Sequence, residues 1–511
     1  MAVSLWLVGC DLWQVIVNGR IWTGTDGIYI TDQMQYLAWV ESASQHLLVA
    51  NLFVIHGTSA DYLQPAIAIS GGLTALGLAP TLALLLWKPV AVIALFLAVR
   101  AYASEALRSS GRYARLAVIA LALFYGSFSL VYGHFGVVGD LFPGFLSWGY
   151  PFALLGVAAA VFAQLAYGRA RLESRFSWWP GVLGALASSM HPWQGEVFLL
   201  ILVGVELTDR RLRVVLWAAR RGLFSPRTAL GSPRLRLFLV TVGLTLLPLV
   251  YYAALDKFDP SWGLGRDASK HAFPFSAIAL ALAPLALVAL LSLRRPDRSF
   301  VGRAVWLWPL AAVIVYFQSG STAGATPLHA FDGITLPLAV LAVDGVVGAR
   351  SWRRIPRRRW LGMALVAAAT IPTTYYEMEQ ARIAALPTAG NANFITSGES
   401  QALNYLRHDP TPGGVLTRFY LGSAVPARTG RHTYVGDCIW SEPNCTGRSV
   451  MSRQLLFGQM TAVQALQFVK STHARFVLSD CTARANLTTA LRPILVSVRR
   501  FGCATVYQVS S

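Results

Sequence analysis

Long apolar segments alternate with short polar loops through most of the chain. The clearest apolar segments are Ala114–Gly133, Gly144–Gly168, Leu237–Leu255, Ser276–Leu293, Gly333–Ala349 and Trp360–Tyr376. Shorter or interrupted segments are Met1–Val17, Ala79–Tyr102, Trp178–Met190, Trp193–Leu207 and Ala304–Gln318. Such segments approach the roughly 20 residues that an α-helix needs to cross a bilayer, and helices satisfy their own backbone hydrogen bonds in lipid. The pattern predicts a polytopic α-helical membrane protein with about eleven transmembrane helices.

Composition and charge agree with a membrane location. The chain is 55% hydrophobic and 13% charged, whereas soluble domains carry about 25% charged residues. The net charge of +19 comes from arginines in short loops: Arg108–Arg115, Arg169–Arg175, Arg210–Arg236, Arg294–Arg303 and Arg350–Arg359. Loops of this kind follow the positive-inside rule, which argues against a nucleic-acid surface. With these loops inside, the N-terminus is predicted inside and the C-terminus outside, in the plasma membrane.

This topology makes residues 18–79 a long first outer loop. Within it, Leu63–Leu78 is punctuated by Gly and Pro and is expected to lie along the membrane interface as a helix. One crossing then runs from about Ala79 to Tyr102. All nine histidines fall on the outer side, and histidine serves both recognition and proton transfer. The outer face is therefore where chemistry is expected.

The tail reads as a separate outer α/β domain, so we expect a membrane module over residues 1–388 and this domain over 389–511. The segments "ESQALNYLRH" and "MTAVQALQFVKS" predict helices, and "GGVLTRFYLGSAVPA", "ARFVLSD" and "CATVYQVSS" predict strands. Its cysteines are Cys438, Cys445, Cys481 and Cys503. An outer domain permits disulfides, and of the three pairings we favour Cys438–Cys445 and Cys481–Cys503.

A polar and aromatic stripe is predicted in the first outer loop. If a helix starts at Asp32, then Gln35, Tyr36, Trp39 and His46 share one face with it. A carboxylate, an amide and aromatic rings along one stripe suit a sugar or a polar lipid head group. The alternative is that Asp32 caps the helix with Gln35 as its capping-box partner. Capping does not exclude catalysis, so both interpretations stay open.

These features resemble the GT-C superfamily of membrane glycosyltransferases, which use polyprenyl-phosphate sugars. The resemblance lies in "TDQMQYLAWV", "LQPAIAISGGL", "YGHFGVVGD", "HPWQGE" and the outer tail. It covers the whole chain as architecture and is specific only in the first loop. The richness in Arg, Ala, Leu and Gly resembles actinobacterial proteins, for which decaprenyl-phosphate mannose and arabinose are typical donors.

The resemblance implies a catalytic carboxylate in the first loop. Asp32 is the best match and Asp26 is the second candidate, while Asp140, after His134, matches a second acidic position of the family. A carboxylate there takes the proton of the acceptor hydroxyl as the new bond forms. Residues expected to bind acceptor or sugar are Gln35, Tyr36 and Trp39. The family's paired acidic motif is not cleanly present and no metal-ligand set stands out, so no obligatory metal or other cofactor is expected.

The leaving phosphate of such a donor needs cationic or polar partners. Outer candidates are Arg266, Lys270 and His271 in "GLGRDASKHAF", and His329 in "ATPLHAFDG". The segment "HPWQGE" adds His191, Trp193 and Glu196 where a broken membrane segment turns back, and polar groups at that depth are functional by default. The alternatives are a capped turn for His191 and a solvated loop pair for Arg266 and Lys270.

The expected function is transfer of a hexosyl or pentosyl group, such as mannose or arabinose, from a polyprenyl phosphate to an envelope glycan, lipid or protein. A polytopic transporter or lipid flippase is the first alternative. Transporters usually show inverted repeats and midplane charges, whereas here the halves show no self-similarity and few charges lie in spans beyond Asp11, Glu105 and Asp344. A non-catalytic protein that binds the envelope is the second alternative and stays open.

Overall fold

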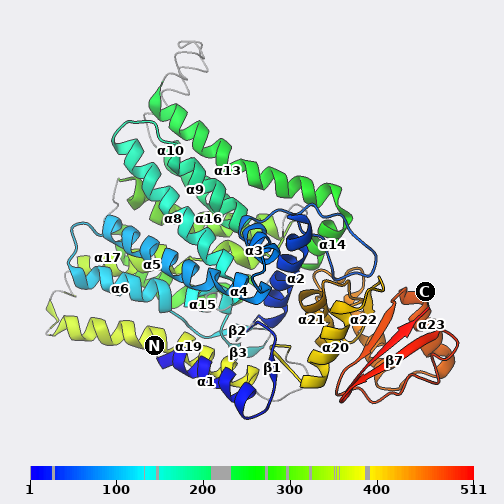
Figure 1. Cartoon of the computed structure of the whole chain (residues 1–511). Coiled ribbons are helices and arrows are strands. Elements are labelled where there is room, and N and C mark those ends of the chain that lie inside the picture. Colours follow the sequence, from blue (N-terminus) through cyan, green and yellow to red (C-terminus); the bar gives the residue numbers. More distant parts are fainter. Residues whose placement is uncertain are drawn as a thin grey trace. The chain divides into compact units, whose positions relative to one another are not determined.

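The computed structural model describes residues 2–25, 29–131, 133–144, 149–208, 232–270, 274–294, 299–321, 325–349, 352, 354–355, 357–385 and 392–510. Two compact units make up the chain (Figure 1). The first unit contains Met1–Trp87, Leu255–Ser269 and Met378–Ser511, and the second contains Lys88–Ala254 and Lys270–Glu377. The units are thus composed differently from the predicted division at residue 389, because the first outer loop packs with the C-terminal region.

The second unit is a bundle of apolar helices. Its helices are α5 (Trp87–Ala106), α6 (Arg112–Phe124), α8 (Pro151–Leu172), α9 (Trp179–Met190), α10 (Pro192–Thr208), α13 (Pro233–Phe258), α15 (Phe275–Ala289), α16 (Phe300–Ser319), α17 (Thr335–Gly348) and α19 (Arg358–Ala384), of which α5, α13 and α19 extend across the unit boundaries. The hairpin β2 (Ser129–Val131) and β3 (His134–Gly136) and the short helices η1 (Gly139–Leu141), η2 (Leu290–Arg294) and η3 (Pro327–Phe331) connect them. Small residues allow close packing: a Cβ on Gly184 of α9 would lie 2.1 Å from Thr245 Oγ1 of α13.

Six helical segments in the described part of the chain are long and apolar enough to cross a membrane. They are Pro80–Ala106, Pro151–Leu172, Pro233–Phe258, Phe275–Leu293, Phe300–Ser319 and Pro327–Gly348. Some other predicted crossings form shorter helices, such as α6 with 13 residues and α9 with 12, whereas Trp360–Tyr376 lies in the 27-residue helix α19. The segment predicted to break does so at His191, because Pro192 follows it and starts α10.

A buried ionic cluster joins three helices of the second unit. Glu206 of α10, only 1% exposed, accepts hydrogen bonds from Arg171 of α8 at 2.8 Å and from Arg234 of α13 at 2.7 Å. The Tyr167 hydroxyl donates to the same carboxylate at 3.1 Å. Two arginines of the predicted inner loops are thus partners of a buried carboxylate, which fixes the ends of these helices.

The first unit combines the N-terminal segment with the C-terminal α/β region. It contains α1 (Ala2–Ile16), β1 (Ile21–Trp22), α2 (Ile30–His46), α3 (Pro65–Ala75), α4 (Pro80–Leu85), α14 (Pro260–Ala268), β4 (Phe394–Ile395), α20 (Ser397–His408), β5 (Val415–Leu416), α21 (Phe419–Thr429), α22 (Cys445–Leu456), α23 (Ala462–Thr472), β6 (Phe476–Ser479), β7 (Leu495–Phe501) and β8 (Ala504–Val509). Strand β1 pairs antiparallel with β4, and Trp6 Nε1 of α1 donates to the Met378 carbonyl at 2.9 Å. These contacts join the N-terminal segment to residues 378–395 (Figure 1).

A four-stranded sheet in the order β5-β6-β8-β7 organises the C-terminal region. Strands β5 and β6 are parallel, and the other neighbours are antiparallel. Its core holds Leu416, Leu455, Val477, Leu491 and Tyr507. The helices predicted at "ESQALNYLRH" and "MTAVQALQFVKS" form α20 and α23, and each begins with a capping box, at Thr396 and Thr461.

One predicted strand of this region is wrong. The segment "GGVLTRFYLGSAVPA" forms only the two-residue strand β5 and then turns into helix α21. Nearly every residue of α21 is buried, and a Cβ on Gly422 would lie 1.8 Å from the Val435 carbonyl oxygen. Packing against α2 and α20 therefore overrides the β-propensity of its Phe, Tyr and Val residues.

Candidate active site

Helix α2 carries the predicted stripe, but it begins before Asp32. Its first residue is Ile30, and Tyr29 before it has φ 60° and makes no side-chain capping bond. Asp32 is therefore the third helical residue, and the interpretation of Asp32 as the N-cap with Gln35 as its partner is wrong. A carboxylate in the first turn is favoured by the helix dipole. Asp26, the second catalytic candidate, lies outside the described residues.

The predicted stripe faces an aromatic cluster inside the first unit. Gln35 and Trp39 are each 6% exposed, and Asp32 and Tyr36 are half-buried. The ring of Trp39 lies 4.9 to 5.8 Å from four others, measured between centroids: Tyr36, Tyr62, Trp262 and Trp440. These rings come from α2, the loop after it, α14 and the loop before α22, so the stripe is a meeting point of separate segments.

Asp437 is the neighbour of Asp32 that sequence reasoning missed. It is 2% exposed, and its Oδ1 accepts a hydrogen bond from the Ile439 amide at 2.9 Å. Burial first, and then the negative charge of Asp32, raise the pKa of Asp437 to about 8. At neutral pH Asp437 is therefore mostly protonated. A carboxyl group with a raised pKa beside a second carboxyl group is typical of acid–base sites.

A second carboxyl pair lies beside the same aromatic rings. Asp259 caps α14 by accepting a hydrogen bond from the Ser261 amide at 2.7 Å. Burial and the nearby charge of Asp259 raise the pKa of Asp61. Trp262, one turn into α14, stacks on Tyr62 with ring centroids 4.2 Å apart. Carboxyl groups thus lie next to the rings of this aromatic cluster. The combination of carboxyl groups and aromatic rings suits a ligand with hydroxyl groups.

Of the predicted cationic loop residues, Arg266 lies in the first unit and Lys270 in the second. Arg266 forms ion pairs with Asp256 and with Asp267, the latter at 3.0 Å, so its charge is compensated. Lys270 ends the turn after α14 and belongs to the second unit, and His271 lies outside the described residues. His134 is exposed on the β2–β3 hairpin. Asp140 falls in η1, and its side chain is outside the described part of the structure.

A buried imidazole cluster in the second unit unites three other predicted residues. His191 and His329 are 6% and 8% exposed, with ring centroids 4.9 Å apart, and Trp193 lies within 4.8 Å of both. Asp332, which the sequence analysis missed, places its Oδ2 3.5 Å from His191 Nε2. Trp193 and Gln194 fix the arrangement by donating to the carbonyls of Ala325 and His329. Glu196 follows on α10 and is partly buried.

Neither cluster offers an evident metal centre. Among the described residues, no three His, Cys, Asp or Glu side chains are grouped as metal ligands. The chemistry available to these residues is acid–base transfer at Asp32 and Asp437, and hydrogen bonding by the buried imidazoles and amides.

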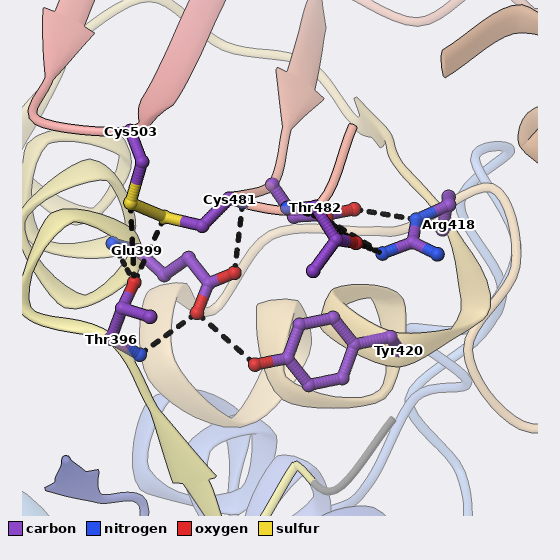
Figure 2. Close-up of a disulfide and its surroundings, with 8 residues drawn as sticks. Thr396, Glu399, Arg418, Tyr420, Cys481, Thr482 and Cys503 are labelled. Carbon is purple, nitrogen blue, oxygen red and sulfur yellow. Dashed lines mark hydrogen bonds and ion pairs between the residues drawn. A yellow bond between two sulfur atoms is a disulfide. The ribbon is translucent and has the colours of Figure 1, made fainter. Parts of the chain in front are cut away.

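Two disulfides stabilise the region that supplies Asp437. Cys438 is bonded to Cys445, next to Asp437, and Cys481 to Cys503, which is the favoured pairing. Figure 2 shows the second disulfide with Thr396 and Glu399 of the α20 cap beside it. The Thr396 hydroxyl lies 3.0 Å from Cys481 Sγ, and Glu399 accepts a hydrogen bond from the Cys481 amide at 3.0 Å.

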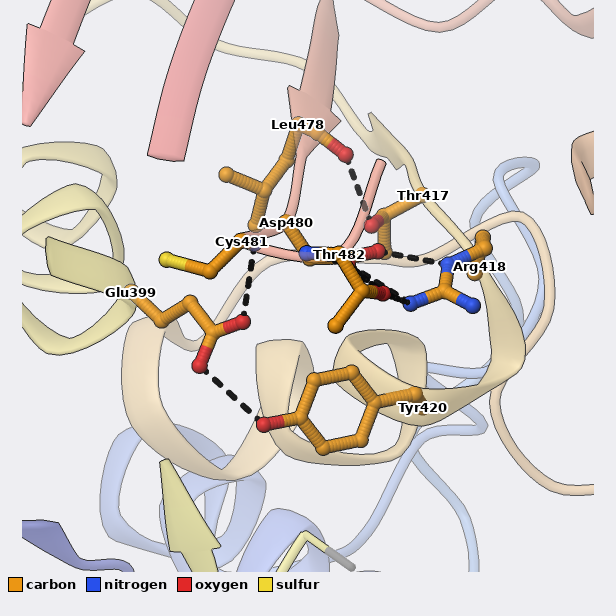
Figure 3. Close-up of polar contacts among 8 residues, drawn as sticks. All are labelled: Glu399, Thr417, Arg418, Tyr420, Leu478, Asp480, Cys481 and Thr482. Carbon is orange, nitrogen blue, oxygen red and sulfur yellow. Dashed lines mark hydrogen bonds and ion pairs between the residues drawn. The ribbon is translucent and has the colours of Figure 1, made fainter. Parts of the chain in front are cut away.

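An ion pair continues this network toward α21, as Figure 3 shows. Arg418 donates to both oxygens of the buried Asp480, each at 2.6 Å, and also to the Thr482 hydroxyl. Tyr420, the second residue of α21, donates to Glu399 at 3.1 Å. Burial alone would raise the pKa of Asp480. Hydrogen bonds from Arg418 and Thr482 outweigh burial and hold this pKa below its ordinary value. The start of α21 is therefore held by two buried carboxylates.

Comparison with known proteins places the fold. No family model matches the chain, and no curated protein matches its sequence. Solved structures of the oligosaccharyltransferase from Archaeoglobus fulgidus do match. The apo form gives a TM-score of 0.54 at 14% identity, over 100% of this chain and 74% of that chain. The chain therefore shares the fold of this archaeal protein.

The same archaeal protein matches in two other states. With a tethered acceptor peptide containing the NVT sequon, it gives a TM-score of 0.53 at 14% identity. With an inhibitory peptide and a dolichol-phosphate, it gives 0.51 at 13% identity, and in both states the match covers 100% of this chain and 74% of that chain. The predicted fold class, a polytopic helical membrane protein with a C-terminal α/β region, is confirmed.

Proposed function

We propose that the protein is a glycosyltransferase that moves a sugar from a polyprenyl-phosphate donor to an acceptor of the cell envelope. The observation that carries the proposal is the pair of Asp32 and the largely protonated Asp437, set beside an aromatic cluster. The GT-C fold supports it, because the archaeal neighbour is an oligosaccharyltransferase that was solved with a dolichol-phosphate. The donor sugar is proposed to be a hexose or pentose, with mannose and arabinose first.

Asp32 is proposed to be the general base. It takes the proton of the acceptor hydroxyl while the acceptor oxygen bonds to the anomeric carbon. The bond from that carbon to the phosphate oxygen breaks, and its electron pair leaves with the lipid phosphate, which inverts the anomeric centre. Asp437 keeps its proton at neutral pH and donates a hydrogen bond within the site, so that the two carboxyl groups do not repel each other. Gln35, Tyr36 and Trp39 hold the sugar or acceptor.

The buried imidazoles of the second unit are proposed to bind the donor. His191 and His329, with the indole N–H of Trp193 nearby, form a polar group among apolar helices, where polar side chains are functional by default. They are proposed to hydrogen-bond the donor phosphate. We also propose that transfer needs no obligatory metal ion.

The protein is proposed to act at the outer face of the plasma membrane, with its N-terminus inside. Disulfides persist in oxidising compartments, so the two bridges of the C-terminal region support an outer location.

The test is transfer by the purified protein. It is incubated with radiolabelled decaprenyl-phosphate mannose and decaprenyl-phosphate arabinose, with and without EDTA, and with a panel of envelope acceptors. Label should reach an acceptor in the wild type and not in Asp32→Asn. Equal transfer by the wild type and by Asp32→Asn would refute the mechanism, and transfer abolished by EDTA would refute the metal-independent step.

A further inference from the structure

A polar pocket lies beside the C-terminal half of α2, and the proposed mechanism does not use it. Ser42, Gln45 and His46 of α2 line one side, Thr58 and Ala60 of the following loop line another, and His432 after α21 completes it. Its volume is about 170 Å³. A single water needs only about 10–15 Å³ on the same kind of measure, so the pocket has room for a ligand much larger than water.

The lining of this pocket suits a neutral ligand with hydroxyl groups. His432 Nδ1 lies 2.8 Å from the Val54 carbonyl, which only accepts, so Nδ1 carries the hydrogen and Nε2 is left as an acceptor. Burial lowers the pKa of His432, which keeps its ring neutral. Gln45 adds an amide with both donors and an acceptor. Because Asp, Glu, Lys and Arg are absent from the lining, a charged ligand would lose hydration without gaining a counter-charge.

The position of the pocket on α2 sets its relation to Asp32. Ser42 and His46 follow Asp32 on the same helix, and at a rise of about 1.5 Å per residue they lie roughly 15–21 Å along it. A single sugar that reacts at Asp32 cannot reach that far. A chain of several sugars can, so a ligand that occupies both places is an oligosaccharide.

We propose that this pocket binds one neutral sugar residue of a glycan, remote from the residue that reacts. The proposal rests on the proposed function and extends it to the substrate class: the protein acts on an oligosaccharide and recognises it at two points along α2. The bound sugar belongs either to the acceptor glycan or to a lipid-linked oligosaccharide donor, and the two sources share the same chemistry.

The test fills the pocket without touching Asp32. Ala60→Trp places an indole in the cavity, and Ser59→Trp, at the exposed neighbouring position, is the matched control. Gln45→Leu removes the amide from an exposed side chain and guards against misfolding of the bulkier variant. In the first arm, mannose acceptors of one to four residues are compared; in the second, lipid phosphates carrying one or several sugars are compared with a monosaccharide acceptor.

The wild type should show a KM that falls on the order of tenfold with chain length in one of the two arms, as one or two added hydrogen bonds give. Ala60→Trp should abolish that dependence, Gln45→Leu should weaken it, and Ser59→Trp should keep it. The rate with the monosaccharide acceptor should be unchanged in all three. The arm that shows the dependence identifies the source of the sugar. Length dependence that is absent from the wild type, or intact in Ala60→Trp, overturns the proposal.

Direct binding separates this inference from the proposed function. Saturation-transfer NMR with mannotetraose should show contact with the wild type and with Asp32→Asn, and none with Ala60→Trp. If neither the wild type nor any variant transfers sugar, but only Ala60→Trp fails to bind mannotetraose, the proposed function is wrong and the pocket proposal stands. If transfer occurs while all variants bind mannotetraose alike, or none binds it, the pocket proposal is wrong and the function stands.

Discussion

Asp437 lies close enough to Asp32 that the charge of Asp32 adds to the effect of burial and raises the pKa of Asp437 to about 8. The two residues come from opposite ends of the chain, one in the first turn of α2 and the other in the disulfide-bonded loop before α22. Their proximity means that the C-terminal region is part of the candidate active site.

The raised pKa of Asp437 predicts a specific dependence of stability on pH. The folded state keeps its proton between the ordinary value near 3.8 and about 8, whereas the unfolded state loses it near 3.8. The contribution of Asp437 to the free energy of unfolding is therefore full below pH 3.8. It falls as the pH rises to about 8, with a slope of up to about 1.4 kcal/mol per pH unit. Asp437→Asn should remove this slope. Urea unfolding of both proteins from pH 4 to 9 checks it, and parallel curves would show that Asp437 is ionised in the fold.

Asp32→Asn should lower turnover by about 10²–10⁴-fold, the usual effect of removing a positioned acid or base. The fold should survive, because asparagine has nearly the same size and Asp32 is not the N-cap of α2. Loss of a negative charge in the first turn of a helix removes a dipole interaction of about 0.3–1 kcal/mol. In Asp32→Asn the pKa of Asp437 should also be lower than in the wild type, because the charge of Asp32, which raises that pKa in addition to burial, is gone. Transfer assays and the stability profile on one preparation check both effects. If Asp26→Asn is inactive while Asp32→Asn transfers normally, the base is Asp26.

The sequence predicts those features of the fold that neighbouring residues determine, and it does not predict those that depend on contacts between distant segments. The break at His191 follows from Pro192, and the strand at Phe476–Ser479 follows from a short β-branched and aromatic run. Asp437 could not be found in this way, because its burial and its proximity to Asp32 depend on how distant segments pack. Its one sequence signal is its position beside Cys438 in an aromatic loop.

The same limit explains the errors at α2 and α21. The start of α2 is set by Tyr29 in a left-handed conformation, which the pattern of polar residues does not reveal. Helix α21 forms from residues with strand propensity because its buried faces pack on α2 and α20. Local signals predicted helices such as α20 and α23, whereas tertiary contacts decided α21 and the neighbours of Asp32.

Labelling from outside the cell tests the proposed topology. Val463 is 65% exposed on α23, so Val463→Cys should react with a membrane-impermeant maleimide on intact cells. Arg354→Cys, in a predicted inner loop, should react only after permeabilisation. The wild type, whose free cysteine is the partly buried Cys10, serves as the background control. Labelling of Arg354→Cys on intact cells would invert the topology and every outer-face assignment.

Removal of the two disulfides should have unequal effects. The Cys481–Cys503 bridge spans 22 residues and the Cys438–Cys445 bridge spans 7. A longer loop loses more entropy in the unfolded chain, so replacing the first pair by serine should cost about 1 kcal/mol more than replacing the second, within the usual ~2–5 kcal/mol per bridge. Chemical denaturation of the two double variants measures this difference. The shorter bridge should matter more for activity, because Asp437 adjoins Cys438.

Asp480→Asn should destabilise the C-terminal region by about 3–5 kcal/mol, because it leaves the largely buried Arg418 without its carboxylate. The exposed pair Glu379–Arg382 is the matched control, and Glu379→Gln should leave stability unchanged. The pH dependence is opposite to that of Asp437. Since the pKa of Asp480 is lowered in the fold, its contribution is present above its ordinary value near 3.8 and is lost as pH falls through the folded value. Acid unfolding of the wild type and Asp480→Asn should therefore converge at low pH, and a gap that stays constant down to pH 2 would show that the charge of Asp480 is not what holds Arg418.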